Sequence, residues 1–153
     1  MKQLQNYLSE NNVAFTVHEH VPAYTAQELA AEEHVSGRKT AKPVIVKTPG
    51  GFAMCVLPAH RKLDLAKAAN ALHAKEVELA GEHELGELFP DSEIGAEPPI
   101  GELYRIRTVM DRELSDADEI VFQAGTHRHS IHMDAGDYVS LTHPDISDIS
   151  VRS

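Results

Sequence analysis

The chain contains 153 residues, 42% hydrophobic and 25% charged, which is typical of a soluble globular protein, and we expect one domain over residues 1–153. Its net charge of −10 argues against strong nonspecific binding to RNA. No stretch reaches the ~18 consecutive apolar residues that a membrane helix needs, and the N-terminus lacks the apolar segment of a secretory signal.

The first part of the chain predicts two helices with a strand between them. Residues 2–11 carry leucines on one helical face, and residues 13–17 alternate between apolar and polar side chains as a half-buried strand does. Thr25 and Glu28 have the spacing of a capping box, in which the two side chains reciprocally bind free backbone N–H groups. We therefore expect a second helix that begins after Thr25 and ends near residue 34.

The next segment predicts two strands around a turn, followed by a helix. Residues 43–47 and 52–58 are β-rich runs on either side of a Thr-Pro-Gly-Gly sequence. Pro43 is acceptable at the first position of a strand, and it also pushes Lys42 into an extended conformation. Residues 62–74 then place leucine and alanine at helical spacing.

The remaining chain mixes short strands and helices without a strict βαβ rhythm. In chain order, we expect a strand at 75–79, a helix at 82–88, a loop at 90–101, strands at 103–109, 119–124 and 130–133, and a closing helix at 134–141. Residues 142–153 are rich in Asp, Ser and Pro, and we expect this tail to fray. The mixture predicts an α/β or α+β domain with a mixed sheet.

Charge is distributed unevenly along the chain. Residues 36–75 contain eight basic residues and one acidic residue, about +7, whereas the rest of the chain carries about −17. A basic field on an acidic protein indicates an anionic partner that meets one face, although a plain solvated face is the alternative. Within this field, Lys42 is the candidate catalytic group, and Lys39, Arg61 and Lys62 are candidate contacts to RNA phosphates.

Two further segments could carry chemistry. The loop 95–101 contains glycines and prolines, and its backbone amides could hold a carbonyl oxygen on which charge develops. The segment 127–132 contains three histidines, and a metal site could recruit two of them with His18 or His20. Because no zinc-type spacing accompanies them, we expect no metal, and we favour His127 as a residue that lines a substrate pocket.

The single cysteine excludes an internal disulfide and fits a reducing cytoplasm. Cys55 lies in the apolar run 52–57, where a cysteine is usually buried and inert. The sequence also lacks a Gly-x-Ser-x-Gly elbow, a Walker loop and a Gly-x-Gly-x-x-Gly motif. A serine or cysteine triad and a nucleotide cofactor are therefore not expected.

An ordered set of short motifs between about residues 15 and 142 resembles one known family. The motifs are His20-x4-Thr25-Ala26-x-Glu28, Thr40–Val46, Val56–Pro58, Leu63–Leu65, Gly95-x3-Pro99-x-Gly101 and Ala124–Gly125. In this order and spacing they resemble the YbaK/ProX family of aminoacyl-tRNA deacylases, which are related to the editing domain of bacterial prolyl-tRNA synthetases. The resemblance implies a compact α/β fold with a mixed, barrel-like sheet and flanking helices. It also implies hydrolysis of mischarged aminoacyl-tRNA in trans.

The resemblance further implies roles for particular residues. The family's essential lysine falls on Lys42, where it would orient the tRNA 3′ end or the substrate. Amides near Gly101 would help to hold the ester carbonyl, and the terminal ribose hydroxyl would assist the water. Positions that would contact the substrate are His20, Thr25, Gly95, Pro99, Gly125 and His127. The chain departs from the family pattern at Pro43 and in its histidine-rich segment after Gly125, which bears on amino-acid specificity.

We therefore expect a cytoplasmic aminoacyl-tRNA deacylase that requires no metal or organic cofactor. Its expected partner is aminoacyl-tRNA, with an aminoacyl-tRNA synthetase as a further candidate, and neither DNA nor a membrane. The alternatives are a non-catalytic module of the same fold that binds tRNA or a synthetase, and a histidine-dependent metalloprotein.

Overall fold

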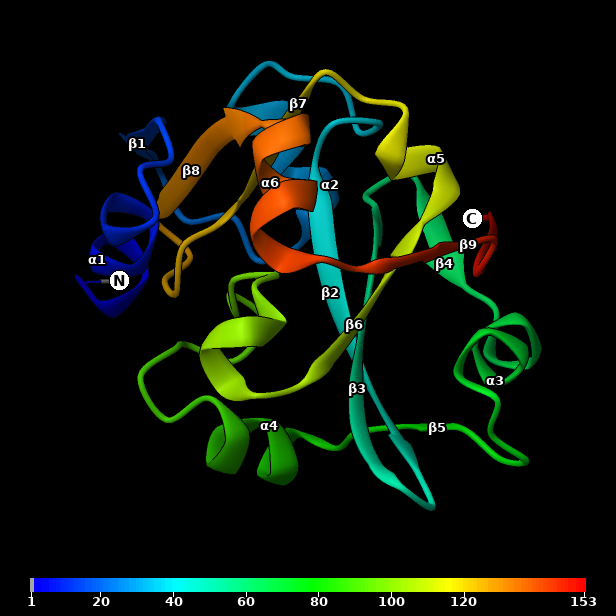
Figure 1. Cartoon of the computed structure of the whole chain (residues 1–153). Helices are drawn as coiled ribbons and strands as arrows, with labels where there is room; N and C mark the ends of the chain where they lie inside the picture. The colour runs from blue at the N-terminus through cyan, green and yellow to red at the C-terminus, as the bar shows by residue number, and fades with distance from the viewer. Residues whose placement is uncertain (1) are drawn as a thin grey trace.

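The computed structural model describes residues 2–153, which form ten strands, six α-helices and one 3-10 helix (Figure 1). The helices are α1 (Lys2–Glu10), α2 (Ala26–Glu32), α3 (Leu65–Leu72), α4 (Glu82–Leu88), η1 (Gly101–Tyr104), α5 (Arg112–Ser115) and α6 (Ala135–Thr142). The strands are β1 (Phe15–Glu19), β2 (Ala41–Thr48), β3 (Gly51–Pro58), β4 (Arg61–Leu63), β5 (Glu78–Leu79), β6 (Arg107–Asp111), β7 (Glu119–Gln123), β8 (His129–Asp134), β9 (Asp145–Ser147) and β10 (Ser150–Arg152). None of these helices combines the length and apolarity needed to cross a membrane.

The strands form three sheets, with the orders β5-β2-β3-β6-β9, β1-β8-β7 and β10-β4. The first sheet is mixed, since β2 and β3 are antiparallel whereas β3, β6 and β9 run parallel. A parallel bridge between Thr40 and Val121 joins the start of β2 to β7. The mixed α/β class is confirmed, but the strands of residues 2–153 form open sheets linked at this bridge and do not close into a barrel.

Alternation along β2 divides the hydrophobic core in two. Ala41 and Ile45 face the main core, which also contains Phe122 of β7 and residues of α1 and α6. Val46 faces a smaller core that contains Leu57 and residues of α3. In Figure 1, α6 lies against the β7–β8 side of the molecule, and α3 lies at the other side, next to β4.

Most predicted elements occur, with changed boundaries. The helix expected at 62–74 is split into β4 and α3, because the Asp64 carboxylate caps α3 by accepting a hydrogen bond from the Lys67 N–H at 3.0 Å. The strand expected at 103–109 begins at Arg107, after η1. The helix α5 was not expected.

The prediction of a frayed tail at residues 142–153 is wrong. This segment contains β9 and β10, which pair with β6 and β4 respectively. The buried Asp111 carboxylate holds the tail, since it accepts hydrogen bonds from the Ile149 N–H at 3.0 Å and the Ser150 hydroxyl at 2.9 Å. The tail is thus fixed by contacts to residues about 40 positions earlier in the chain.

Candidate active site

Lys42 is the second residue of β2, and its side chain is partly buried. Its Nζ atom donates a hydrogen bond to the Ala59 carbonyl oxygen at 3.3 Å. Burial lowers the pKa of the Lys42 ammonium from its ordinary value, because desolvation disfavours the charged form. The Lys42 side chain is therefore fixed by a hydrogen bond, and burial disfavours its charged form. Its place in β2 agrees with the extended conformation predicted for the residue before Pro43.

The Lys42 side chain shares a face with Gln123 of β7. Residues of a strand point alternately to opposite faces, and Ala41 and Phe122, the neighbours of these two residues, both pack into the main core. The parallel bridge between β2 and β7 places the two strands edge to edge. Lys42 and Gln123 thus lie on the face opposite the main core.

A second group of residues gathers around the Ala23 carbonyl oxygen. This oxygen accepts a hydrogen bond from the Gln123 side-chain amide at 2.6 Å, and His127 Nδ1 lies 3.1 Å from it. His127 Nε2 lies 2.9 Å from the Ile94 carbonyl oxygen. Because carbonyl oxygens only accept, a neutral imidazole satisfies one of these contacts and a protonated imidazole satisfies both. His127 thus joins the segment after β1 to the loop 90–101.

Glu97 lies in this loop, and the sequence analysis did not single it out. Its side chain is only 5% exposed, and one carboxylate oxygen accepts a hydrogen bond from the Gly95 N–H at 2.8 Å. Burial raises the pKa of the Glu97 carboxyl, while backbone hydrogen bonds and the charge of His127 oppose the rise. A buried carboxyl of this kind is a candidate for proton transfer. The available signal was an acidic residue inside an otherwise apolar, proline-rich loop.

Two glycines of the predicted site hold the loop in place. Gly95 has a φ of +90°, and a Cβ atom there would lie 3.3 Å from His127 Cε1. Gly125 has a φ of +93°, and its N–H donates a hydrogen bond to the Ala96 carbonyl oxygen at 2.9 Å. Both positions require a backbone conformation that glycine adopts without strain. Gly95, Gly125 and His127, which were predicted from distant segments, are brought together.

Gly101 and Pro99 are buried on the other side of the loop. A Cβ atom on Gly101 would lie 2.2 Å from Thr108 Oγ1 and 2.5 Å from the Ile106 carbonyl oxygen, so close packing against β6 requires glycine. The Pro99 carbonyl oxygen accepts a hydrogen bond from the buried Tyr138 hydroxyl. These contacts are structural, and the predicted contacts of both residues with a substrate stay predictions.

Two buried side-chain atoms in this part of the protein have no hydrogen-bond partner among the described residues: Gln123 Oε1, whose amide belongs to the Ala23 group, and His20 Nε2. The other ring nitrogen of His20 lies 2.6 Å from the Val21 carbonyl oxygen and so carries a proton, which leaves Nε2 as an acceptor when the ring is neutral. Gln123 Oε1 is an acceptor as well. Buried polar atoms are normally paired, so each of these two atoms marks a point where a hydrogen-bond donor would bind.

Thr25 acts as the N-cap of α2. Its hydroxyl accepts a hydrogen bond from the Glu28 N–H at 3.0 Å, as the capping-box pattern predicts. The Glu28 carboxylate accepts instead from the Tyr24 N–H at 2.9 Å, one residue earlier than the pattern requires. The Thr25 hydroxyl is thus engaged within the chain, and its predicted contact with a substrate is untested.

The predicted phosphate contacts differ in their surroundings. Lys39 forms an ion pair with Asp118 at 3.0 Å. The Arg61 guanidinium donates hydrogen bonds to the hydroxyl and carbonyl oxygens of Ser150, at 2.6 and 3.1 Å, and so holds β10 against β4. Lys62 is exposed, whereas Lys39 and Arg61 are partly buried. Of the three, Lys62 is thus the cation most accessible to a ligand.

A surface hollow of about 500 Å³ lies elsewhere, at the tip of the β2–β3 hairpin, where Thr48, Phe52, Lys75 and Arg107 are among its lining residues. It contains none of the predicted site residues. We assign the candidate site to the region of Lys42, Gln123 and the Ala23 group, because Gln123 joins Lys42's face to this group and its Oε1 is a buried acceptor without a partner among the described residues.

Residues 20–141 match the aminoacyl-tRNA editing domain family. The chain belongs to this family. The match covers every predicted site residue and confirms the resemblance to YbaK/ProX editing domains. It extends from His20 to the end region of α6, so the fold elements that carry the candidate site all lie within the editing domain.

Solved structures support the same fold. A candidate trans-editing enzyme for prolyl-tRNA synthetase is 21% identical, with a TM-score of 0.84 over 98% of this chain and 96% of that chain. A hypothetical protein is 22% identical, with a TM-score of 0.88 over 97% and 99% of the two chains. A scaffold protein from a study of computational epitope grafting is 21% identical, with a TM-score of 0.86 over 99% and 97%. At these identities, the similarity establishes the fold.

Proposed function

We propose that this editing domain is a trans-acting deacylase that removes a wrongly attached amino acid from aminoacyl-tRNA. The observation that carries the proposal is the family match over residues 20–141. The resemblance of the motif Thr40–Val46 puts the family's essential lysine at Lys42. Lys42 is held by the Ala59 carbonyl oxygen and shares a face with Gln123, whose Oε1 is a buried acceptor without a partner among the described residues. In this proposal the enzyme acts in the cytoplasm on aminoacyl-tRNA, with a synthetase as a further partner, and it needs no cofactor.

The reaction is hydrolysis of the ester between the amino acid and the terminal ribose. Water attacks the ester carbonyl carbon, the bond to the ribose oxygen breaks, and that oxygen takes up a proton. The Lys42 ammonium orients the negatively charged 3′ end of the tRNA, and positioning of this kind can supply a large part of a rate enhancement. Backbone amides of the loop 95–101 stabilise the developing oxyanion, and the neighbouring ribose hydroxyl assists the water.

The two unpaired acceptors suit the amino acid itself. An aminoacyl ester carries an α-ammonium group, which has three N–H donors and no acceptor. Gln123 Oε1 and His20 Nε2 can each accept one of these hydrogen bonds. His127 and Gly95 fix the loop beside them and so shape the space that the amino-acid side chain occupies. Size exclusion and hydrogen bonding together then set which amino acid is accepted.

The test is release of free amino acid from a panel of mischarged and correctly charged tRNAs. The proposal expects multiple turnovers with at least one mischarged tRNA and slow release from its correctly charged counterpart. Binding to tRNA without release of amino acid from any member of the panel would contradict it. That outcome would support the alternative, a non-catalytic module of the same fold that binds tRNA or a synthetase.

A further inference from the structure

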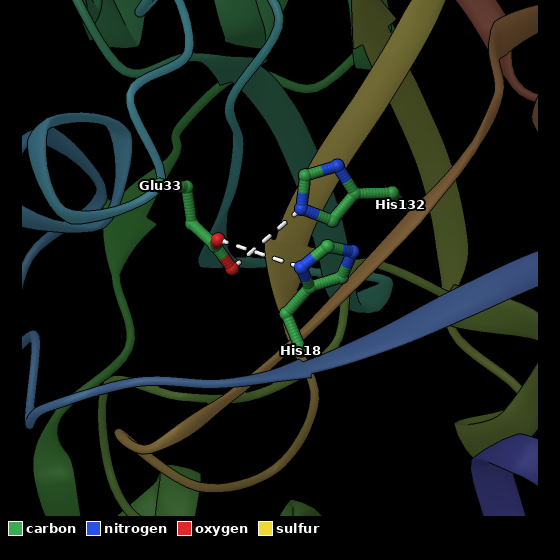
Figure 2. A group of neighbouring side chains, drawn as sticks. All are labelled: His18, Glu33 and His132. Carbon is green, nitrogen blue, oxygen red and sulfur yellow. Dashed lines mark ion pairs between the residues drawn. The ribbon is translucent and has the colours of Figure 1, made fainter.

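His18, Glu33 and His132 form a compact group outside the candidate active site (Figure 2). His18 lies on β1, His132 lies on the neighbouring strand β8, and Glu33 follows the last turn of α2. Figure 2 shows both imidazole rings pointing toward the Glu33 carboxylate. The ring centroids are 4.0 Å apart, and one nitrogen of each ring and one carboxylate oxygen all lie within 4.8 Å of one another. Three elements thus converge on one point.

In each imidazole ring, the nitrogen that points away from Glu33 has a hydrogen-bond partner that orients the ring. His132 Nδ1 lies 2.7 Å from a Glu119 carboxylate oxygen, which only accepts, so Nδ1 carries the proton. His18 Nε2 lies 3.1 Å from the Thr16 hydroxyl. Donation from His18 Nε2 to this hydroxyl leaves Nδ1 with its lone pair. Partners of this kind fix the tautomer and orientation of metal-bound histidines.

The ring nitrogens nearest to Glu33 face its carboxylate oxygens without forming a hydrogen bond to them. His132 Nε2 is buried, has no hydrogen-bond partner among the described residues, and lies 3.6 Å from Glu33 Oε1. His18 Nδ1 lies 3.8 Å from Glu33 Oε2. The Glu33 side chain is only 10% exposed, and its Oε1 also accepts a hydrogen bond from the Ser130 hydroxyl. A shielded carboxylate that faces two ring nitrogens is stabilised by a cation between them, either a proton on one ring or a metal ion.

We propose that His18, Glu33 and His132 bind a divalent transition-metal ion of the zinc class. Two imidazole nitrogens and one carboxylate oxygen are ligands that such ions prefer, with water in the fourth position. Tetrahedral bonds of about 2.0–2.1 Å place the ligand atoms about 3.3 Å apart. His132 Nε2 lies 3.6 Å from Glu33 Oε1 and His18 Nδ1 lies 3.8 Å from Glu33 Oε2, so each ring nitrogen is a few tenths of an ångström beyond this separation from its own nearest carboxylate oxygen. Binding of one ion by both rings therefore requires rotation of the Glu33 carboxylate together with His18, whose side chain is 44% exposed.

The metal ion would join the two ends of the segment 18–33 to β8. This segment leaves β1, carries the Ala23 carbonyl oxygen that binds Gln123, and continues through α2 to Glu33. Because the three ligands converge only in the folded protein, the ion stabilises the folded state and braces the segment against β8. The ion stabilises one wall of the candidate active site, and no step of the proposed hydrolysis passes through it.

Titration of the metal-stripped protein with Zn²⁺, and with Co²⁺ as a spectroscopic probe, tests the proposal. We expect one equivalent to bind, tetrahedral Co²⁺ absorption bands, and a rise in Tm of about 5 °C at saturating Zn²⁺. His18→Ala and His132→Gln should each weaken binding at least 100-fold. Glu119→Gln, which removes the carboxylate behind His132, should weaken binding about 10- to 100-fold.

His83→Ala is the matched control, because His83 is an exposed histidine on α4 that lies beside a glutamate, Glu87. It should bind Zn²⁺ as the parent does. Absence of saturable binding to the parent, or equal affinity in His18→Ala and the parent, would overturn the proposal. His18 is exposed, so His18→Ala should remain folded, and the readout does not depend on deacylation. Failure here is therefore separate from failure of the proposed function.

Discussion

At the scale of single residues, burial sets the protonation of Glu97. Its pKa is raised above the ordinary value of 4.5, so the folded protein binds this proton more tightly than the unfolded protein does. The contribution of Glu97 to the free energy of unfolding is therefore greatest below the unfolded pKa and is lost as the pH rises through the raised folded pKa.

We predict that Glu97→Gln flattens this pH dependence. Glutamine keeps an oxygen that can accept from the Gly95 N–H and cannot ionise. Between about pH 4.5 and 7, the free energy of unfolding of the parent should fall relative to that of Glu97→Gln, as measured by urea denaturation. A parent that gains stability relative to the variant over this range would show that Glu97 is stabilised in its ionised form.

We expect His127 to shape specificity through the loop that it contacts. Both of its ring nitrogens contact backbone carbonyl oxygens, so His127→Ala removes the side-chain link between the Ala23 segment and the loop at Ile94. We predict that the variant changes the ranking of accepted aminoacyl-tRNAs more than it slows hydrolysis of the best one, since a pocket discriminates a methylene by only about 1–3 kcal/mol. An unchanged ranking over the same panel would exclude His127 from the pocket.

At the scale of elements, the close contact between η1 and β6 predicts the effect of Gly101→Ala. The new methyl group would meet Thr108 Oγ1 and the Ile106 carbonyl oxygen at distances well below contact. We expect a loss of about 1–3 kcal/mol in the free energy of unfolding, because overpacking displaces backbone. Gly86→Ala is the control. No atom lies within 4 Å of its Cβ position in α4, and it should gain about 0.5–1 kcal/mol. Equal effects in the two variants would contradict the packing argument.

Local sequence patterns predicted the elements that depend on residues close together in the chain. The Thr25 cap, the β2–β3 hairpin and the closing helix α6 depend on residues a few positions apart, and all three occur. The sheet pairing of β10 with β4 joins residues almost 90 positions apart, and no local pattern indicates it. The burial of Glu97 depends likewise on the fold around its loop.

The candidate site was likewise predicted only where local sequence patterns indicated it. Lys42 was predicted from its charge and its place before Pro43, and it lies in an extended conformation as expected. Charge counts could not show that Arg61 is bound to Ser150, or that Lys39 is paired with Asp118. Those partners lie far along the chain or in a separate loop. The group of His18, Glu33 and His132 also appears only when β1, β8 and α2 are assembled.

At the scale of the whole molecule, the proposed function requires tRNA to bind an acidic protein, so its phosphates should contact the basic residues of the segment 36–75. We predict that Lys62→Ala weakens binding about equally for different tRNAs and reduces the slope of log Kd against log salt by about 0.7–0.9, the value for one lost phosphate contact. Lys62 is exposed, so the variant should keep the parent's stability. A binding curve and salt slope equal to the parent's would exclude this face.

On the same strand, Arg61→Ala distinguishes an effect of the Arg61 charge on tRNA binding from an effect of its hydrogen bonds on stability. It removes two hydrogen bonds to Ser150 and should lower the free energy of unfolding by about 1–3 kcal/mol. The double variant with Lys62→Ala should bind tRNA more weakly than the parent with a flatter salt dependence. If Arg61→Ala alone changes the salt slope while stability is unchanged, Arg61 faces phosphate and its contact with β10 is dispensable.

The central claim is that Lys42 organises ester hydrolysis, and the rate of amino-acid release from the best mischarged tRNA tests it most directly. Lys42→Met keeps the aliphatic stem and removes the charge. Lys75→Met makes the same change between α3 and β5, where Lys75 lines the hollow at the tip of the β2–β3 hairpin. We predict a loss of about 100-fold in Lys42→Met, with the fold retained, and parent-like turnover in Lys75→Met. Turnover by Lys42→Met equal to that of the parent would contradict it.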